Sequence, residues 1–105
     1  MVDLTGKEHM LCTQDVVIAD ERGVIALAGV IGGTNSCIDT NTKNIIIEIA
    51  HFDPVAVRRT SVRLGVRTDA VMRYEKNISP ALTYVAPMIA FDLLEKLLPN
   101  NGTLQ

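Results

Sequence analysis

Two kinds of apolar pattern alternate along the chain and predict an α+β fold. Residues 15–20 and 24–30 are apolar, β-branched runs around a short Gly-containing connection, which is typical of a β-hairpin. Residues 44–50 hold three consecutive isoleucines and predict a strand covered on both faces. Apolar residues at helical spacing predict helices near 54–64 and 80–98. We therefore expect a mainly antiparallel sheet with these three strands, and the two helices packed on it.

Turn and cap signals set the ends of these elements. Asp53 before Pro54 is a helix start, and Gly65 is a stop for the same helix. Ser79-Pro80 repeats the start signal for the second helix, and Pro99-Asn100-Asn101-Gly102 ends it. Near the beginning, Leu4-Thr5-Gly6-Lys7 separates two short apolar stretches and predicts a further hairpin.

Composition narrows the class of protein. A chain of 105 residues that is 48% hydrophobic can bury one core, so we expect a single domain over residues 1–105. The formal net charge is -2, which excludes a global positive field and leaves only local contacts with RNA. Two cysteines favour a reduced compartment, so we expect a cytoplasmic protein. No apolar run is long enough to span a bilayer, and no membrane partner is expected.

The motifs that could carry chemistry are few. Gly29 to Gly33 lacks the Gly-Lys-Ser/Thr of a phosphate-binding loop. The histidines and cysteines lack the paired spacing of a structural metal site, so no metal is expected. A group of arginines on or after the first helix could meet phosphates, although a solvated face is the favoured interpretation: Arg58, Arg59, Arg63 and Arg67.

A carboxylate and a threonine remain as candidates. Glu48 lies within the predicted buried strand, where a lone charge costs several kcal/mol and needs a partner or a pocket. Pairing with Arg63 or Arg73 is favoured over catalysis on the residues alone. Thr68, in Arg67-Thr68-Asp69-Ala70, is favoured as a cap or turn residue. By themselves these residues identify no reaction.

Several segments taken in order resemble one protein family. LAGVIGG (27–33), a strand ending in Glu, FDP, RR, LG and RTDAVMRYE (67–75) together are similar to a continuous stretch of the editing module of bacterial-type phenylalanyl-tRNA synthetase β subunits. The similarity covers about residues 4 to 98. It implies that the domain is the C-terminal portion of a larger editing module.

The resemblance implies a function and a site. In that family the module hydrolyses mischarged tyrosyl-tRNA specific for phenylalanine. The matching pocket positions are Gly32, which leaves room for the amino-acid ring, Thr68 and Ala70 on the opposite wall, and Glu48, which accepts a hydrogen bond from the tyrosine hydroxyl. No residue matches a general base, so no catalytic residue is assigned and water is activated mainly by positioning.

The resemblance also implies partners. These are the 3′ end of charged tRNA(Phe), the remainder of the β subunit and the α subunit of the full enzyme. No cofactor is expected for editing, since ATP and magnesium belong to the aminoacylation reaction of the full synthetase.

Departures from the family pattern limit the expected activity. Val71 stands where the family usually has Ser, and Lys76-Asn77-Ile78-Ser79-Pro80 stands where the family reads Arg/Lys-Gly-Val-Asp-Pro. The family's module also has a preceding half, with a histidine in a Pro-x-His-Ala-Phe-Asp setting, which these 105 residues do not contain. His51 is not expected to take that role. We expect the isolated chain to be inactive or weak, with a noncatalytic scaffold or a free-standing trans-editing hydrolase as alternatives.

Overall fold

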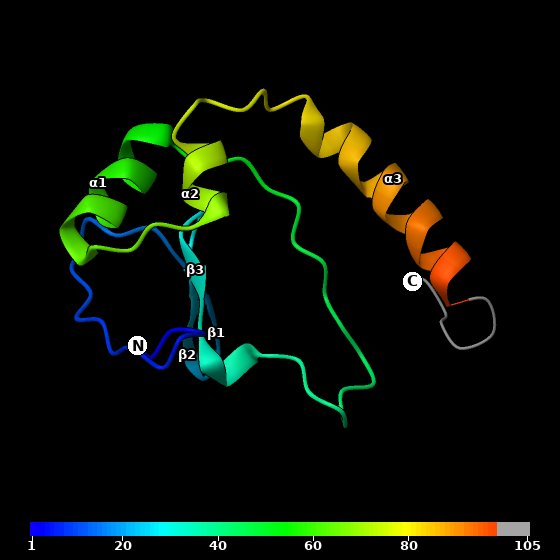
Figure 1. The fold of residues 1–105 in the computed structure, drawn as a ribbon, viewed down its shortest axis with the longest axis horizontal. Helices are drawn as coiled ribbons and strands as arrows, with labels where there is room; N and C mark the ends of the chain where they lie inside the picture. Colours follow the sequence, from blue (N-terminus) through cyan, green and yellow to red (C-terminus); the bar gives the residue numbers. More distant parts are fainter. Residues whose placement is uncertain (99–105) are drawn as a thin grey trace. The chain divides into compact units, whose positions relative to one another are not determined.

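The computed structural model describes residues 1–98, and its elements confirm the α+β class. The elements are β1 (Val17–Asp20), β2 (Gly23–Leu27), β3 (Ile31–Gly32), the 3-10 turn η1 (Thr34–Ser36), α1 (Pro54–Leu64), α2 (Asp69–Tyr74) and α3 (Leu82–Leu97), shown in Figure 1. The predicted helix end at Pro99 to Gly102 lies outside the described residues.

The chain divides into two compact units. The first unit combines Met1–Ile46 with Phe52–Ile78, and the second combines Ile47–His51 with the segment that starts at Ser79. The first unit therefore holds the sheet, α1 and α2, whereas α3 belongs to the second. That residues 1–105 form a single domain, and that the last helix packs on the sheet, stay predictions.

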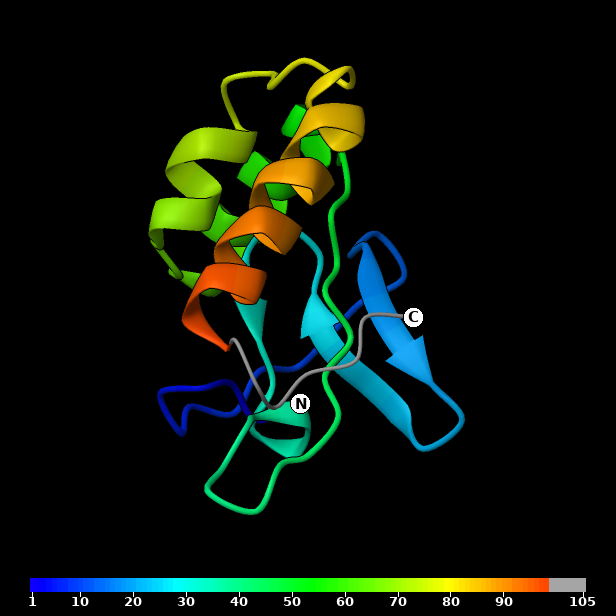
Figure 2. The ribbon, with the colours of Figure 1, turned by 90° about the vertical axis from the view of Figure 1, so that its right-hand side faces the viewer.

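The sheet is antiparallel, with strand order β1-β2-β3. The predicted strand 24–30 ends earlier, because Gly29 has a φ of 68° and the chain turns there before β3 pairs back onto β2. The β1–β2 hairpin is visible in Figure 2. The predicted hairpin near the beginning also forms, with a bridge between Val2 and Glu8 and a second bridge from Asp3 to Gly33.

The predicted strand at 44–50 is wrong. Residues 42–53 have no regular secondary structure, and Ile45, Ile46 and Ile47 are 55%, 99% and 41% exposed. The two edges of β2 are occupied by β1 and β3, and Leu4 donates a backbone hydrogen bond to Gly32 on the far side of β3. In the described residues the apolar run pairs with none of these strands, so apolar character alone does not make a strand.

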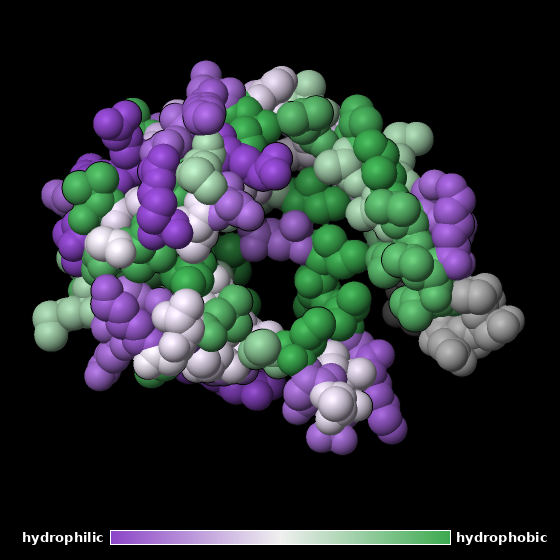
Figure 3. Space-filling model, viewed as in Figure 1, coloured by the Kyte–Doolittle hydropathy of each residue, from purple (hydrophilic) through white to green (hydrophobic). Residues whose placement is uncertain are grey.

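Helix α1 forms as predicted because its caps are strong. The Asp53 carboxylate accepts a 2.6 Å hydrogen bond from the amide of Ala56, and Pro54 occupies the first turn. Gly65 follows in the left-handed conformation with a φ of 65°. Helix α3 begins at Leu82 and contains Pro87 in its interior. None of its residues is buried, and Figure 3 shows apolar side chains along its surface.

Helix α2 was not predicted, because six residues are too short to show a helical period. It lies beside α1, next to the turn that joins β2 to β3 (Figure 1). The core of the first unit fills the space between these elements. It consists of one leucine and four valines, namely Leu27, Val30, Val57, Val66 and Val71.

Candidate functional site

The glycine-rich segment 27–33 is held tightly by its neighbours. A methyl group on Gly29 would lie 2.9 Å from Cγ2 of Val57 and 3.1 Å from Cδ2 of Phe52. One on Gly33 would lie 2.8 Å from the carbonyl oxygen of Ile25. Gly29 also has positive φ, so a side chain there would be strained as well as crowded. These two glycines are therefore required by the fold itself.

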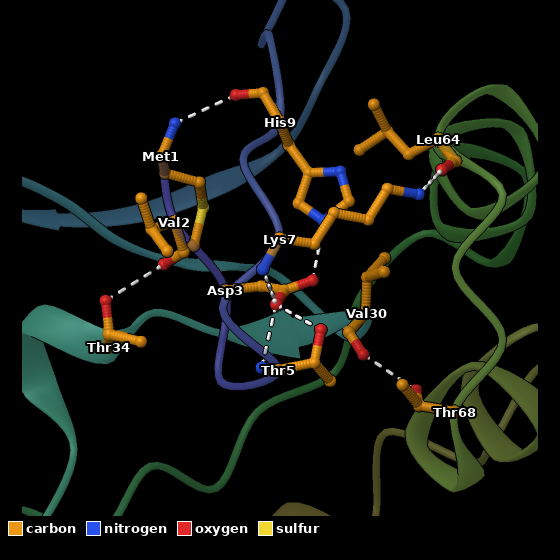
Figure 4. A network of polar contacts seen from close by, with 10 residues as sticks. All are labelled: Met1, Val2, Asp3, Thr5, Lys7, His9, Val30, Thr34, Leu64 and Thr68. Atoms are coloured by element: carbon orange, nitrogen blue, oxygen red, sulfur yellow. Dashed lines mark hydrogen bonds and ion pairs between the residues drawn. The ribbon is translucent and has the colours of Figure 1, made fainter.

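Thr68 joins the glycine segment to the start of α2. Its hydroxyl donates a 2.7 Å hydrogen bond to the carbonyl of Val30 (Figure 4). The same hydroxyl accepts a 3.2 Å hydrogen bond from the amide of Val71. The interpretation of Thr68 as a cap is confirmed. The same hydroxyl brings together the two sequence segments, 27–33 and 67–75, that lie far apart in the chain.

The predicted pocket residues fall into both units. Gly32, Thr68 and Ala70 belong to the first unit and are partly buried, whereas Glu48 belongs to the second and is exposed. Their shared role in one pocket stays a prediction. The expectation that Glu48 lies within a buried strand is wrong, because its segment has no regular structure.

The carboxyl of Glu48 still loses part of its hydration, and this desolvation raises its pKa. The suggested partner Arg63 is engaged elsewhere, since its guanidinium pairs with Asp15.

The arginines of α1 are exposed, as the solvated-face interpretation expects, and two of them also donate hydrogen bonds within the chain. Arg63 donates to the carboxylate of Asp15 and to the carbonyl of Met10, and Arg59 donates to the carbonyl of Gln14. These contacts tie α1 to the loop that leads into β1. With Arg67, which pairs with Glu75, three of the four arginines considered for phosphate contacts thus make internal hydrogen bonds.

Asp15 is the centre of this connection. Its carboxylate, whose side chain is 2% exposed, accepts hydrogen bonds from Arg63, from the hydroxyl of Thr60 at 2.9 Å and from the amide of Cys12 at 2.8 Å. Burial by itself raises the pKa of Asp15, but these hydrogen bonds outweigh it and bring the pKa down to about 2. Sequence reasoning missed this cluster, although Thr60 and Arg63 are three residues apart and share one face of a helix.

A second buried carboxylate, Asp3, organises the first hairpin (Figure 4). It is 1% exposed and lies 2.6 Å from Nε2 of His9, which is 4% exposed. Its other bonds come from the hydroxyl of Thr5 at 2.6 Å and the amides of Thr5 and Lys7. The hydroxyl of Thr5 and the ring of His9 hold the pKa of Asp3 far below its usual range. The spacing Asp-x-Thr before Gly6 was the available signal for such a turn.

Arg67 and Glu75 close α2 with a two-pronged ion pair. The two guanidinium nitrogens of Arg67 lie 2.7 and 2.6 Å from the two carboxylate oxygens of Glu75. These hydrogen bonds lower the pKa of Glu75 and raise that of Arg67. Arg67 and Glu75, the first and last residues of segment 67–75, are therefore structural partners of each other.

No helix within residues 1–98 is long and apolar enough to cross a membrane. In the same part of the chain, no group of three or more His, Cys, Asp or Glu side chains is placed to hold a metal ion.

Comparison with known proteins identifies the relatives of this chain. Residues 1–99 match the family described as B3/4 domain. The phenylalanine–tRNA ligase beta subunit of Gluconobacter oxydans is 49% identical over 78 residues, which are 74% of this chain and 10% of that protein. The subunit of the same name from Latilactobacillus sakei is 46% identical over 97 residues, covering 92% of this chain and 12% of the relative. That of Deinococcus radiodurans is 46% identical over 124 residues, with 96% of this chain and 15% of the relative covered. The chain thus spans between 10% and 15% of the length of these relatives.

Proposed function

The chain belongs to the B3/4 domain family, and on that premise we propose that it forms part of a proofreading site that hydrolyses tyrosyl-tRNA(Phe). Its relatives named phenylalanine–tRNA ligase beta subunit support a role in that enzyme, where tRNA and an α subunit would be its partners. The observation that carries the proposal is the hydrogen bond from Thr68 to Val30, which joins the two sequence segments expected to form opposite walls. The site would act in the cytoplasm, without a cofactor bound to this chain.

The proposed pocket recognises the tyrosine side chain. Gly32 would leave room for the ring, Thr68 and Ala70 would bound the opposite side, and Glu48 would accept a hydrogen bond from the phenolic hydroxyl. A site built around such a partner discriminates well, because an analogue that lacks the hydroxyl leaves the polar group of the site unpaired. Glu48 is exposed, so it would discriminate strongly between tyrosine and phenylalanine only when the bound substrate shields it from water.

The proposed reaction is ester hydrolysis at the 3′ end of the tRNA. Water attacks the carbonyl carbon that links tyrosine to the terminal ribose, and the bond to the ribose oxygen breaks. The products are free tyrosine and uncharged tRNA. We assign no general base to this chain, so its contribution is to bind and orient the ester.

Titration with L-tyrosine and L-phenylalanine, followed by NMR of this chain, tests the proposal. Saturable shifts at Gly32, Glu48, Thr68 and Ala70 are expected, with tyrosine bound more tightly than phenylalanine. Glu48→Ala should remove the preference for tyrosine. Glu95→Ala, which removes an exposed carboxylate in α3, is the matched control and should leave the preference unchanged. Equal affinity for the two amino acids in the unsubstituted chain would contradict the assignment of Glu48.

A noncatalytic scaffold is the second candidate, and one observation favours it. The hydroxyl of Thr68 already makes two hydrogen bonds within the chain, so its presence is explained by the fold alone. The absence of any saturable shift with tyrosine, together with no release of tyrosine from tyrosyl-tRNA(Phe), would support this candidate. Hydrolysis as brisk as that of a complete editing protein would instead refute the expectation that the isolated chain is weak.

A further inference from the structure

We infer that Leu4 is a specificity-determining residue of the proposed site, because its side chain covers the face that Gly32 leaves open. This inference rests on the proposed function and deepens it. It adds a residue of the first hairpin to the predicted pocket, and it assigns that residue the selection of ring size rather than recognition of the hydroxyl.

The contact between Leu4 and Gly32 is direct. A methyl group on Gly32 would lie 3.2 Å from Cδ1 and 3.5 Å from Cγ of Leu4. Apart from the chain neighbours of Gly32, no other residue in the described part of the chain approaches that position within 4 Å. The amide of Leu4 also donates a 3.0 Å hydrogen bond to the carbonyl of Gly32. The space that a side chain on Gly32 would take is therefore occupied by one leucine side chain.

The backbone that carries Leu4 is held in place. Leu4 is the second residue of a β-turn closed by a 2.9 Å hydrogen bond from the amide of Gly6 to the carbonyl of Asp3. The buried carboxylate of Asp3 fixes both sides of this turn through Thr5 and Lys7 (Figure 4). Such a turn positions its side chains more exactly than a free loop does.

The exposure of Leu4 is unusual for its position. Turn corners favour polar residues and glycine, yet Leu4 is apolar and 53% exposed. Its contact with Gly32 covers only part of the side chain. The rest of the side chain is exposed apolar surface, which suits an aromatic ring better than a charged or polar group.

This arrangement predicts how ring size is selected. A ring that sits against Gly32 would meet the branched end of Leu4, and each methyl group of that end bounds the available space. Removal of one carbon from an apolar pocket changes binding by about tenfold or more. Shortening Leu4 should therefore weaken the binding of tyrosine and of phenylalanine by the same factor, and it should favour the binding of an amino acid with a larger ring.

Titrations of this chain with L-tyrosine, L-phenylalanine and L-tryptophan, followed by NMR, test the inference. With Leu4→Ala, the affinity for tryptophan relative to tyrosine should rise by about tenfold, while the ratio of tyrosine to phenylalanine stays unchanged. Leu4→Val removes less of the side chain and should shift the tryptophan ratio in the same direction by a smaller factor. Val62→Ala removes apolar surface from α1, where Val62 is 72% exposed, and should leave every ratio unchanged.

The outcomes separate the inference from the function on which it rests. Unchanged ratios in both Leu4 variants, with tyrosine still bound, would overturn the role of Leu4 and leave the proposed function intact. If the unsubstituted chain binds no tyrosine, both are overturned. Should Leu4→Ala lose the dispersed spectrum of a folded chain, the Leu4→Val ratio decides the matter.

Discussion

Two regions were expected to form the site, and they differ in the fold. The first is segment 27–33 with the start of α2, and the second is segment 44–50. In the first region, the hydroxyl of Thr68 is doubly hydrogen-bonded, and Gly29 is packed against α1. In the second region, Ile46 is 99% exposed and Glu48 is exposed. The difference shows that the first region makes its hydrogen bonds and packing contacts within its own unit. The second region has strand-like residues that pair with no strand in the described part of the chain.

The largest effect should come from filling the glycine that the first region needs most. Gly29→Ala should destabilise the chain by about 3 kcal/mol, from a positive φ and from overpacking against Val57 and Phe52. Gly65→Ala is the matched control, because Gly65 has a similar φ of 65° and no atom within 4 Å of the added methyl group. Denaturant unfolding of both variants measures the packing contribution as their difference. Equal losses would show that the glycine segment is not tightly packed.

Removing the hydroxyl that joins the two segments should have the next largest effect. Thr68→Val keeps the shape of the side chain but leaves the amide of Val71 without its cap, and should cost about 2 kcal/mol. Thr68→Ser keeps the hydroxyl and should cost less than about 0.5 kcal/mol if both hydrogen bonds persist. Thermal and denaturant unfolding provide the measurement. A Ser variant as unstable as the Val variant would mean that the methyl group, not the hydroxyl, matters.

Two carboxylates extend the comparison to pH. The pKa of Asp15 is lowered to about 2 in the folded chain, against 3.8 for the unperturbed group, so its contribution is present above about pH 4 and lost as pH falls toward 2. Asp15→Asn should cost about 1.5 kcal/mol at pH 7 and flatten the loss of stability in that pH window.

Glu48→Gln is the contrasting variant to Asp15→Asn. Folding raises the pKa of Glu48, so its ionised form is disfavoured in the fold, and this variant should be neutral or slightly stabilising at pH 7. Urea unfolding between pH 2 and pH 7 measures both variants. A loss of stability in Glu48→Gln that matches Asp15→Asn would indicate that Glu48 has a buried cation as a partner.

The same contrast shows what could be predicted from the sequence. The caps at Asp53 and Gly65 are local signals, and α1 ended where they indicated. The hairpins were predicted for the same reason, because turn residues act within a few positions of the chain. The bonds of Asp15 to Thr60 and Arg63 join positions at least 45 residues apart, so no local pattern reports them. The isoleucines of 44–50 indicated correctly that the segment is apolar, but whether it pairs depends on a neighbouring edge.

The smallest effect should come from that exposed isoleucine segment. Ile46→Thr should change the free energy of unfolding by less than about 0.5 kcal/mol, since a fully exposed side chain loses no packing on substitution. Val71→Ala is the buried counterpart. Val71 is 0% exposed, and this variant should cost about 2 kcal/mol because the cavity lies in the core of the first unit. Paired denaturant titrations compare the two. A loss above about 1 kcal/mol in Ile46→Thr would mean that segment 44–50 buries this isoleucine in solution, and the contrast between the two regions would then be lost.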